Sequence, residues 1–250
     1  MEKKEGEKNK FGLIGRNIDY SFSKSYFTKK FNILSLDGYS YENFHLDTIS
    51  EFPELLRLNS GLKGLNITIP YKEKIIPFLD EIDEEASKIG AVNTIHLTET
   101  GLKGFNTDAY GFKRSLFPHL KSNYTNALIL GTGGASKAVA YVLDQLGIDV
   151  TYVSRNPKIG QLAYSDLDKE LIESNKICIN CTPLGTYPDV LAKPSIPYKY
   201  LGPDHLLYDL IYNPSKTAFL KEGEIRGATI INGSQMLELQ AEKAWDIWNS

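Results

Sequence analysis

Three short segments in the first half of the chain set polar side chains among strand-forming residues: Gly64–Lys72 (GLNITIPYK), Gly90–Ile95 (GAVNTI) and Gly104–Asp108 (GFNTD). Each contains an Asn and a Thr close together. A polar group of this kind that is buried without a partner costs about 1–3 kcal/mol. Burying all of them for structure alone is therefore costly, and we expect a small polar ligand to satisfy them.

Lys72 ends the first segment and is the residue there best suited to chemistry. In an extended strand, Asn66 and Thr68 share one face. Ile67 and Ile69 take the other face and can pack a core. Thr68 then presents a hydroxyl beside whatever Lys72 reaches, which suits a small polar substrate. The alternative is an edge strand with a solvated lysine, because lysine is almost never fully buried without a partner.

Asp108 ends the third segment and stands just before apolar residues spaced for a helix, Tyr110, Phe112 and Leu116. Its carboxylate could contact a ligand. It could equally be a helix N-cap, which is the commonest use of Asn, Thr and Asp before such a run.

A glycine-rich turn follows a strand in the second half of the chain. Asn126–Leu130 is a nearly continuous apolar strand, as expected for one covered on both faces. It leads into Gly131-Thr132-Gly133-Gly134-Ala135 and then a helix, before a second strand at Asp149–Val153. Such a turn lets backbone N–H groups approach a pyrophosphate at the helix N-terminus. In this context we favour dinucleotide binding over a simple tight turn.

The end of the second strand bears on which dinucleotide binds. An NAD site usually has Asp or Glu there, bonded to the ribose 2′-hydroxyl. This chain has Ser154, Arg155 and Lys158 instead. Arg and Lys suit a 2′-phosphate, so we predict NADP, the alternative being solvated basic residues in a loop.

Two further strand ends, residues 177–185 and 206–214, carry Thr182, Leu210 and Tyr212. Loops after strands line the ligand crevice of an open α/β sheet, so these residues are expected to face a cofactor and its substrate. The chain ends in an amphipathic helix, about Ser234 to Trp248, in which Gln240 is the polar exception.

Composition sets broad limits. The chain has 250 residues, 42% hydrophobic and 24% charged, enough for one large or two modest domains. A net charge of -3 and a pI near 5.9 give no general attraction for nucleic acid or an anionic membrane. Residues 1–10 alternate in charge without an apolar stretch. We expect a disordered tail there, with neither signal peptide nor transmembrane segment, in a cytoplasmic protein.

Strands and helices alternate from Phe11 to about Thr107, which predicts an α/β arrangement with a largely parallel sheet. The expected elements are a strand at Phe11–Ile14, a helix at Ser25–Leu34, a strand at Ser40–Leu46, a helix at Thr48–Leu58 and a strand at Leu65–Ile69.

Cys178 and Cys181 have the C-x-x-C spacing of redox and zinc sites. Their segment is typical of a buried strand, in which residues three apart point to opposite faces. No second cysteine pair or nearby histidine completes a tetrahedral set. We therefore expect no metal site.

Taken in order, these motifs closely resemble the shikimate dehydrogenase family over about Phe11 to Trp248. The resemblance implies an N-terminal α/β substrate-binding domain, residues 11–107 joined by a returning helix at 233–250. It also implies a Rossmann-type NADP-binding domain with a parallel sheet, residues 108–232. The implied reaction is the NADPH-dependent reduction of 3-dehydroshikimate to shikimate, on the way to chorismate and the aromatic amino acids.

The resemblance also implies roles for single residues. Lys72 would be the catalytic acid/base and Asp108 its partner and a substrate ligand. The other implied substrate ligands are Ser21 and Ser23, which resemble the family's carboxylate-binding serines, and Thr68, Asn93, Tyr212 and Gln240. Tyr20 and Lys24 depart from the family pattern, in which His and Pro are common there. The implied cofactor-binding residues are Gly131, Thr132, Gly133, Gly134, Ala135, Ser154, Arg155, Lys158, Thr182, Leu210 and Gly233.

Two other functions remain open from the sequence. One is a quinate/shikimate dehydrogenase that uses NAD, against which Arg155 argues. The other is a noncatalytic ligand-sensing module, against which the retained Lys72 and Asp108 argue. We expect a monomer or homodimer that binds the small-molecule substrate and no nucleic acid or membrane.

Overall fold

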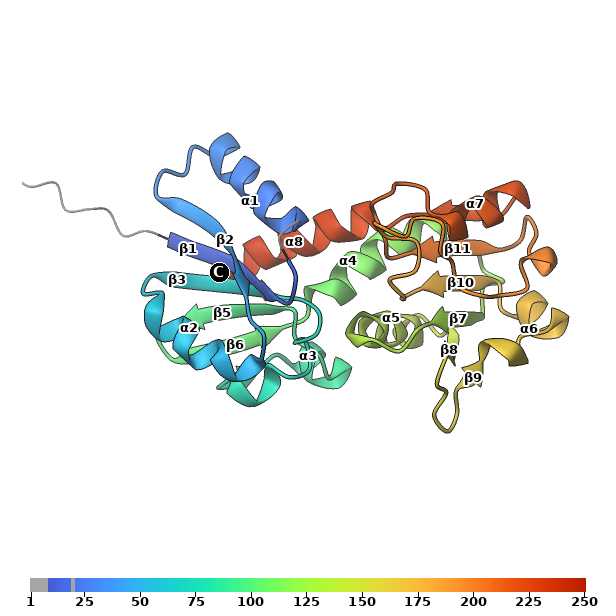
Figure 1. Cartoon of the computed structure of the whole chain (residues 1–250), viewed down its shortest axis with the longest axis horizontal. Helices are drawn as coiled ribbons and strands as arrows, with labels where there is room; N and C mark the ends of the chain where they lie inside the picture. Colours follow the sequence, from blue (N-terminus) through green and yellow to red (C-terminus); the bar gives the residue numbers. More distant parts are fainter. Residues whose placement is uncertain (1–8, 19–20) are drawn as a thin grey trace, which may run out of the picture. The chain divides into compact units, whose positions relative to one another are not determined.

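The structure, a computed structural model, describes residues 9–18 and 21–250. The chain divides into two compact units (Figure 1). The first contains the residues up to Thr107 and Ala241–Ser250, and the second contains Asp108–Gln240. The second boundary differs from the expected one at 232/233, because helix α8 (Ser234–Trp248) gives its first half to the second unit and its second half to the first.

The first unit is built on a six-stranded sheet in the order β2-β1-β3-β5-β6-β4. The strands are β1 (Asn9–Gly15), β2 (Tyr39–His45), β3 (Leu62–Ile67), β4 (Glu81–Ile82), β5 (Thr94–Thr98) and β6 (Gly101–Phe105). Among these strands only β5 runs against the others, so the prediction of a largely parallel sheet is confirmed.

The disordered tail predicted over residues 1–10 overlaps the first strand by two residues. Asn9 and Lys10 pair with Tyr39 and Ser40 in the parallel β1–β2 ladder, which supplies partners for their backbone groups. Residues 1–8 of that prediction, and Tyr20, lie outside the described residues.

The helices of the first unit are α1 (Phe22–Ile33), η1 (Ile49–Glu51), α2 (Phe52–Leu58), η2 (Ile76–Phe78) and α3 (Glu84–Ile89). The helix predicted over Thr48–Leu58 is split into η1 and α2, with Pro53 in the first turn of α2. Proline has no N–H to donate and suits the start of a helix, which accounts for the break.

The strand predicted to reach Ile69 ends at Ile67. Beyond it the chain turns, and the Tyr71 N–H donates to the Thr68 carbonyl at 2.9 Å. Ile69 is 70% exposed, so the prediction that it packs a core face is wrong, because strand alternation no longer governs its direction.

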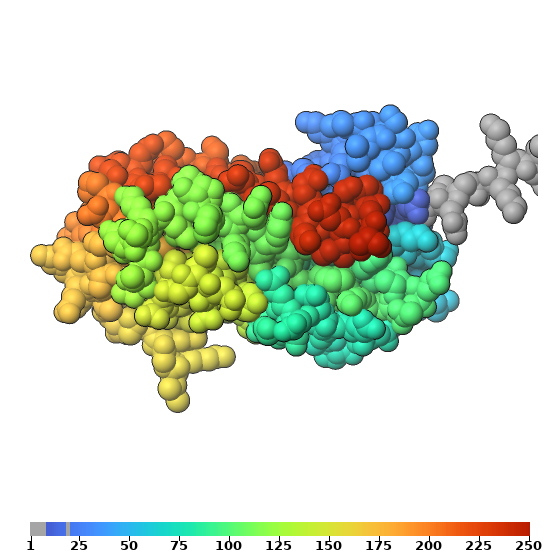
Figure 2. Space-filling model, turned by 180° about the vertical axis from the view of Figure 1, so that it is seen from behind, coloured from blue at the N-terminus to red at the C-terminus, as the bar shows by residue number. Residues whose placement is uncertain are grey.

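Two clusters of apolar side chains form the core of the first unit. One gathers aromatic rings from α1, β1, β2 and the end of α8, including Phe11, Phe27 and Trp248. The Trp248 indole N–H donates to the Ile95 carbonyl at 2.9 Å. A Cβ on Gly64 would lie 2.2 Å from that indole nitrogen, so only glycine fits there. In Figure 2 the end of α8, in red, lies on the surface of the first unit.

The second unit has a six-stranded sheet in the order β12-β11-β10-β7-β8-β9, and the neighbouring strands in it are parallel. The strands are β7 (Asn126–Leu130), β8 (Asp149–Ser154), β9 (Leu162–Ala163), β10 (Ile177–Asn180), β11 (Leu206–Asp209) and β12 (Thr229–Ile231). The helices are α4 (Thr107–Leu116), η3 (Phe117–His119), α5 (Gly134–Gln145), η4 (Tyr164–Asp166), α6 (Lys169–Ser174), η5 (Tyr198–Tyr200) and α7 (Ala218–Ile225).

The chain order of this sheet reverses between β7 and β10. From β7 the strands proceed outward through β8 and β9, and from β10 they proceed the other way through β11 and β12. In open α/β sheets, ligands bind at the carboxyl ends of the strands beside such a reversal. The predicted Rossmann-type α/β fold is confirmed. The loops after β7 and β10 are therefore the expected place for its ligand.

None of the helices in the described part of the chain is long and apolar enough to cross a membrane.

Candidate active site

The carboxyl ends of β1 and β3 meet at Gly15. A Cβ there would lie 2.5 Å from Thr68 Cγ2 and 2.6 Å from Ile18 Cγ2, so only glycine lets these segments come together. The Thr68 N–H donates to the Ile14 carbonyl at 2.9 Å, which fixes the turn that carries the threonine. Gly15 was not singled out from the sequence, although a glycine that ends an apolar strand was a signal for close approach.

Ser21 and Ser23 lie at the start of α1. Ser21 is the N-cap, and its Oγ accepts from the Ser23 N–H at 3.1 Å. Capping uses a lone pair of the hydroxyl, whose proton can still be donated to a carboxylate. Ser23 is buried and Lys24 is exposed in the first turn. Ser21 therefore caps the helix, and this role is compatible with ligand binding.

Lys72 is half-buried, and its backbone carbonyl is hydrogen-bonded. The Val92 N–H donates to the Lys72 carbonyl at 2.7 Å, which brings the lysine next to the segment of Asn93. The preceding residue, Tyr71, is buried, and its hydroxyl donates to the Leu46 carbonyl at 2.6 Å. The backbone at Lys72 is therefore held in place, and its side chain is less exposed than that of the neighbouring Lys74.

Members of all three Asn/Thr pairs, namely Asn66, Asn93, Thr94 and Thr107, are hydrogen-bonded to one another, which the sequence did not predict. Asn66 Oδ1 accepts from the Tyr41 hydroxyl at 2.7 Å, and its Nδ2 donates to Thr94 Oγ1 at 3.2 Å. Asn93 Oδ1 accepts from the Thr107 N–H at 2.7 Å and from Thr94 Oγ1 at 3.1 Å. The expectation that they need a ligand is therefore wrong for Asn66, because tertiary structure supplies partners from other strands.

This buried polar network, defined as Tyr41, Asn66, Asn93, Thr94 and Thr107, links β2, β3 and β5 to the start of α4. All five side chains are buried. Burial raises the pKa of Tyr41, so the phenol stays neutral and donates. The network fixes the orientation of the Asn93 amide, one of the predicted substrate ligands.

Asp108 and Gln240 lie on adjacent helices of the second unit. A Cβ on Gly111 would lie 2.5 Å from the Met236 carbonyl oxygen and 3.1 Å from the backbone nitrogen of Gln240, so α4 and α8 cross closely there. Both side chains are buried. Because α4 begins at Thr107, Asp108 is inside its first turn and is not the N-cap. Lys72 belongs to the first unit, so its pairing with Asp108 stays a prediction.

The glycine turn stands between β7 and α5. Gly131 has a φ of 103°, a value that favours glycine, and its Cβ would lie 2.9 Å from Thr182 Cγ2. The N-cap of α5 is Gly133, which has no side chain with which to cap the helix. A Cβ on Gly133 would meet nothing within 4 Å. The turn with Thr132, Gly134 and Ala135 thus offers the N-terminus of a 12-residue helix to an anion.

The loop between β8 and β9 projects from the second unit (Figures 1 and 2) and carries Arg155 and Lys158, both exposed. Ser154 is buried at its base, where its Oγ accepts from the Asn156 N–H at 3.2 Å. Burial raises the pKa of Tyr164, and the charge of Arg155 opposes that rise.

Thr182, Leu210, Tyr212 and Gly233 lie in the loops after β10 and β11 and before α8. A Cβ on Gly233 would lie 2.1 Å from the Leu210 carbonyl oxygen, so these two segments touch. Tyr212 is exposed, and partial burial raises the pKa of its phenol. Sequence reasoning missed two buried residues behind these loops, Asn180 and Asp209, although both are polar residues that end apolar strands.

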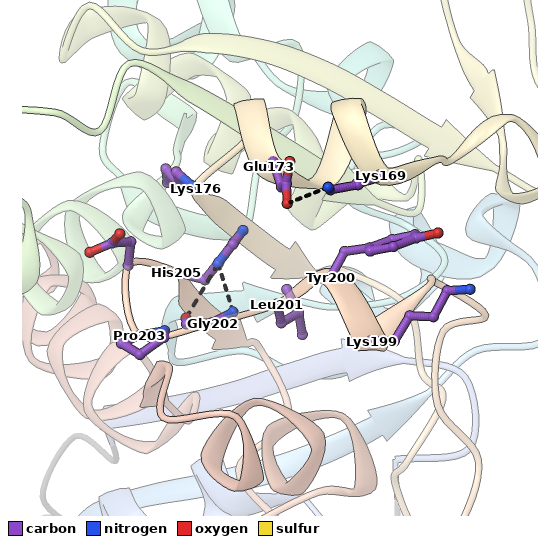
Figure 3. Close-up of a pocket in the computed structure, with 10 residues that line it drawn as sticks. Lys169, Glu173, Lys176, Lys199, Tyr200, Leu201, Gly202, Pro203 and His205 are labelled. Atoms are coloured by element: carbon purple, nitrogen blue, oxygen red, sulfur yellow. Dashed lines mark hydrogen bonds and ion pairs between the residues drawn. The ribbon is translucent and has the colours of Figure 1, made fainter.

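The cavity in Figure 3, of about 590 Å³, lies at the opposite end of the same sheet. Its residues Lys176 and His205 directly precede β10 and β11, so it opens at the amino ends of the strands. His205 Nδ1 accepts from the Gly202 N–H at 3.0 Å, and its Nε2 is 3.0 Å from the Ile172 carbonyl oxygen. One ring nitrogen thus holds the loop before β11 and the other contacts α6. Because ligands of open α/β sheets bind at the carboxyl ends of the strands, this cavity is not the candidate site.

Among residues 9–18 and 21–250, no group of three or more His, Cys, Asp or Glu side chains could hold a metal ion. Cys178 and Cys181 are free thiols, and burial raises the pKa of Cys178 to about 12.

Comparison with known proteins gives concordant matches. Residues 13–95 match the family model of the shikimate dehydrogenase substrate binding domain. A relative from Clostridium botulinum named shikimate dehydrogenase (NADP(+)) is 38% identical over 95% of both chains. The crystal structure of shikimate dehydrogenase 1 from Peptoclostridium difficile has 38% identity and a TM-score of 0.83, with 96% of this chain and 91% of that one covered. The Thermus thermophilus enzyme in complex with NADP(H) and shikimate has 31% identity and a TM-score of 0.84, with 96% and 92% covered.

Proposed function

Because this chain belongs to the shikimate dehydrogenase family, we propose that it catalyses the reversible, NADPH-dependent reduction of 3-dehydroshikimate to shikimate. The observation that carries the proposal is the uncapped glycine turn at the strand reversal of the second unit, followed by a basic loop after β8. That combination fits a phosphorylated dinucleotide, and the product serves the synthesis of chorismate and the aromatic amino acids.

The residues present fit NADP(H). Backbone N–H groups at Gly133 to Ala135 would hold the pyrophosphate, helped by the α5 dipole. Arg155 and Lys158 would hold the 2′-phosphate, to which a guanidinium can donate two parallel hydrogen bonds. Ser154, Thr182, Leu210 and Gly233 would line the remainder of the cofactor.

The substrate contacts divide by chemistry. Ser21 and Ser23 would donate to the planar carboxylate. Thr68 and Asn93 would bind ring hydroxyls, with the Asn93 amide already oriented by the buried polar network. Tyr212, Gln240 and Asp108 would complete the site.

Lys72 would handle the proton. Bound NADPH supplies the hydride, and the ketone oxygen gains negative charge as the new C–H bond forms. A cationic Lys72 near that oxygen stabilises the charge and donates the proton that completes the alcohol. In the reverse direction the neutral amine accepts the hydroxyl proton. Asp108, as its partner, would favour the charged form of the lysine.

A spectrophotometric assay tests the proposal directly. Purified protein should reduce NADP⁺ in the presence of shikimate and oxidise NADPH in the presence of 3-dehydroshikimate. Parallel assays with NAD⁺ and with quinate separate the quinate/shikimate alternative. Absence of turnover with every pair, in protein shown to be folded, would reject the enzyme and favour a noncatalytic module.

We also propose, from the sequence, that the enzyme works in the cytoplasm as a monomer or homodimer. Light scattering on the purified protein measures its mass, and a stable tetramer would contradict the second part.

A further inference from the structure

Asp209 ends β11 and is fully buried, at 0% exposure. Its Oδ1 accepts from Asn180 Nδ2 and from the Ile211 N–H, both at 3.0 Å, and its Oδ2 accepts from the Thr217 hydroxyl at 2.6 Å. In the described part of the chain it forms no ion pair with a Lys, Arg or His side chain. A buried carboxylate held only by neutral donors is uncommon.

Two of the three donors connect Asp209 to the loops that we assign to the cofactor: Asn180 ends β10 directly before one loop, and Ile211 lies in the other, after β11. Asn180 in turn accepts, through Oδ1, from the N–H of Thr182 at 3.0 Å and from its hydroxyl at 2.6 Å. Ile211 follows Leu210, and its N–H bond to Asp209 sets the bend in which Leu210 sits. The carboxylate is therefore the common anchor of the loop after β10 and the loop after β11.

The same network reaches the glycine turn. Thr182 Cγ2 occupies the space that a side chain on Gly131 would need. A shift of Thr182 would therefore change the packing behind the turn proposed to bind pyrophosphate.

The charge of Asp209 is finely balanced. Burial raises its pKa to about 6, and the hydrogen bonds from Thr217, Ile211 and Asn180 oppose that rise. Two other titratable groups lie near enough to be affected by it, the thiol of Cys181 and the phenol of Tyr198, because the charge of Asp209 adds to the effect of burial on the pKa of each. Burial raises the pKa of both, so they stay neutral and Asp209 is the group that changes charge near neutral pH.

We propose that Asp209 is the positioning residue of the NADP(H) site, and that its carboxylate holds the Thr182 loop and the Leu210–Tyr212 loop in their binding arrangement. Ionised, it gives each donor a charge-assisted bond. Protonated, it keeps Oδ1 for two donors and turns an O–H toward Thr217, much as an asparagine would. This proposal rests on the proposed function, since it assumes that these loops bind NADP(H).

The experiment measures the Kd of NADPH by titration for the parent, Asp209→Ala and Asp209→Asn. Losing the charge-assisted bonds should raise the Kd by about 10- to 150-fold in Asp209→Ala, as expected for 1.5–3 kcal/mol. Asp209→Asn keeps the geometry and should raise it roughly 5-fold at pH 8.

The pH profile separates positioning from general destabilisation. As pH falls through about 6, Asp209 of the parent protonates, so its Kd should converge on that of Asp209→Asn. Titration of the 2′-phosphate affects both proteins alike and cancels in the ratio of their Kd values. Thr217→Val removes a hydrogen bond that favours the ionised form of Asp209, so the pKa of Asp209 should be higher in this variant. The rise in its Kd for NADPH on acidification should therefore begin at a higher pH than in the parent.

His205→Gln is the matched control, because it disturbs a buried hydrogen-bonded side chain at the other end of β11. It should lower the melting temperature without changing the Kd of NADPH. A folded Asp209→Ala that binds NADPH within two-fold of the parent, or a Kd ratio for Asp209→Asn that does not change with pH, would overturn the proposal. If Asp209→Ala does not fold, Asp209→Asn and Thr217→Val decide.

Failure of the proposed function gives a different result. A folded parent that does not bind NADPH would reject that function. Amide hydrogen exchange then reads the positioning without any ligand. Compared with the parent, Asp209→Asn should speed amide exchange at Ile211 and Thr182 and leave exchange at Ile231 unchanged. Exchange rates equal to those of the parent at all three positions would contradict the role of Asp209 as an anchor.

Discussion

The two units present polar groups in opposite ways. In the first unit, Asn93, a proposed substrate ligand, belongs to the buried polar network of Tyr41, Asn66, Asn93, Thr94 and Thr107, which holds several strands together. In the second, the groups proposed to touch the cofactor are backbone N–H groups of a glycine turn and two exposed cations. Under these assignments, changes in the buried network should affect both stability and substrate binding, whereas changes at the exposed Arg155 or Lys158 should affect cofactor binding alone.

The largest effect is expected for Lys72→Met. The change keeps the apolar stem but removes the proton, so kcat should fall by about 10²–10⁴, the usual range for a positioned acid/base. The KM for 3-dehydroshikimate should change less, because the carboxylate and hydroxyl contacts remain. Steady-state kinetics measure both. Lys74→Met, at an exposed neighbour, is the control and should match the parent. Turnover by folded Lys72→Met within a few-fold of the parent would make Lys72 a structural lysine.

Arg155→Ala tests whether cofactor binding can be weakened without loss of stability. Loss of a charge-assisted contact to the 2′-phosphate should weaken NADPH binding by about 10- to 150-fold, or 1.5–3 kcal/mol. NADH binding should change little, because NADH lacks that phosphate. Since Arg155 is exposed, the free energy of unfolding should stay within about 0.5 kcal/mol of the parent. Titration with both cofactors checks this, with the exposed Lys199→Ala as control, and equal losses for both would reject the assignment.

Asn66→Ala tests whether a change in the buried polar network affects both stability and substrate binding. It leaves the Tyr41 hydroxyl and Thr94 without their partner, which should lower the free energy of unfolding by about 1–3 kcal/mol. The loss should be present without any ligand, and the KM for shikimate should rise because Asn93 is less well oriented. Urea unfolding measures the first effect. Asn156→Ala, at an exposed loop position, should cost less than about 0.5 kcal/mol. A stability loss that appears only with ligand bound would break the comparison.

Substitution of Ser21 should have the smallest effect. Two variants separate its role as the N-cap of α1 from its proposed role in substrate binding. Ser21→Ala removes both the hydroxyl and the N-cap of α1 and should cost about 1 kcal/mol of stability. Ser21→Gly also removes the hydroxyl but should cost only a few tenths of a kcal/mol, because glycine is tolerated at an N-cap. If the hydroxyl binds the substrate carboxylate, both should raise the KM for shikimate equally. A rise that follows stability instead would leave Ser21 as a cap alone.

Local patterns determined the elements of the second unit. The apolar run at Asn126–Leu130, the glycine turn and the helix behind it lie where the sequence predicts them. Strand alternation failed only where the chain left the sheet, as at Ile69. The sequence by itself thus determined the α/β fold class, the glycine turn, and through a resemblance the family.

Only the tertiary structure decided how the polar residues are satisfied. Asn66 and Tyr41 are 25 positions apart, and Asn180 and Asp209 are 29 apart, yet each pair is hydrogen-bonded. No local pattern predicts such pairs, because they depend on which strands become neighbours and on the register between them. For the same reason Asp209, which the sequence shows only as the end of a strand, became an anchor of two loops once β10 and β11 were paired.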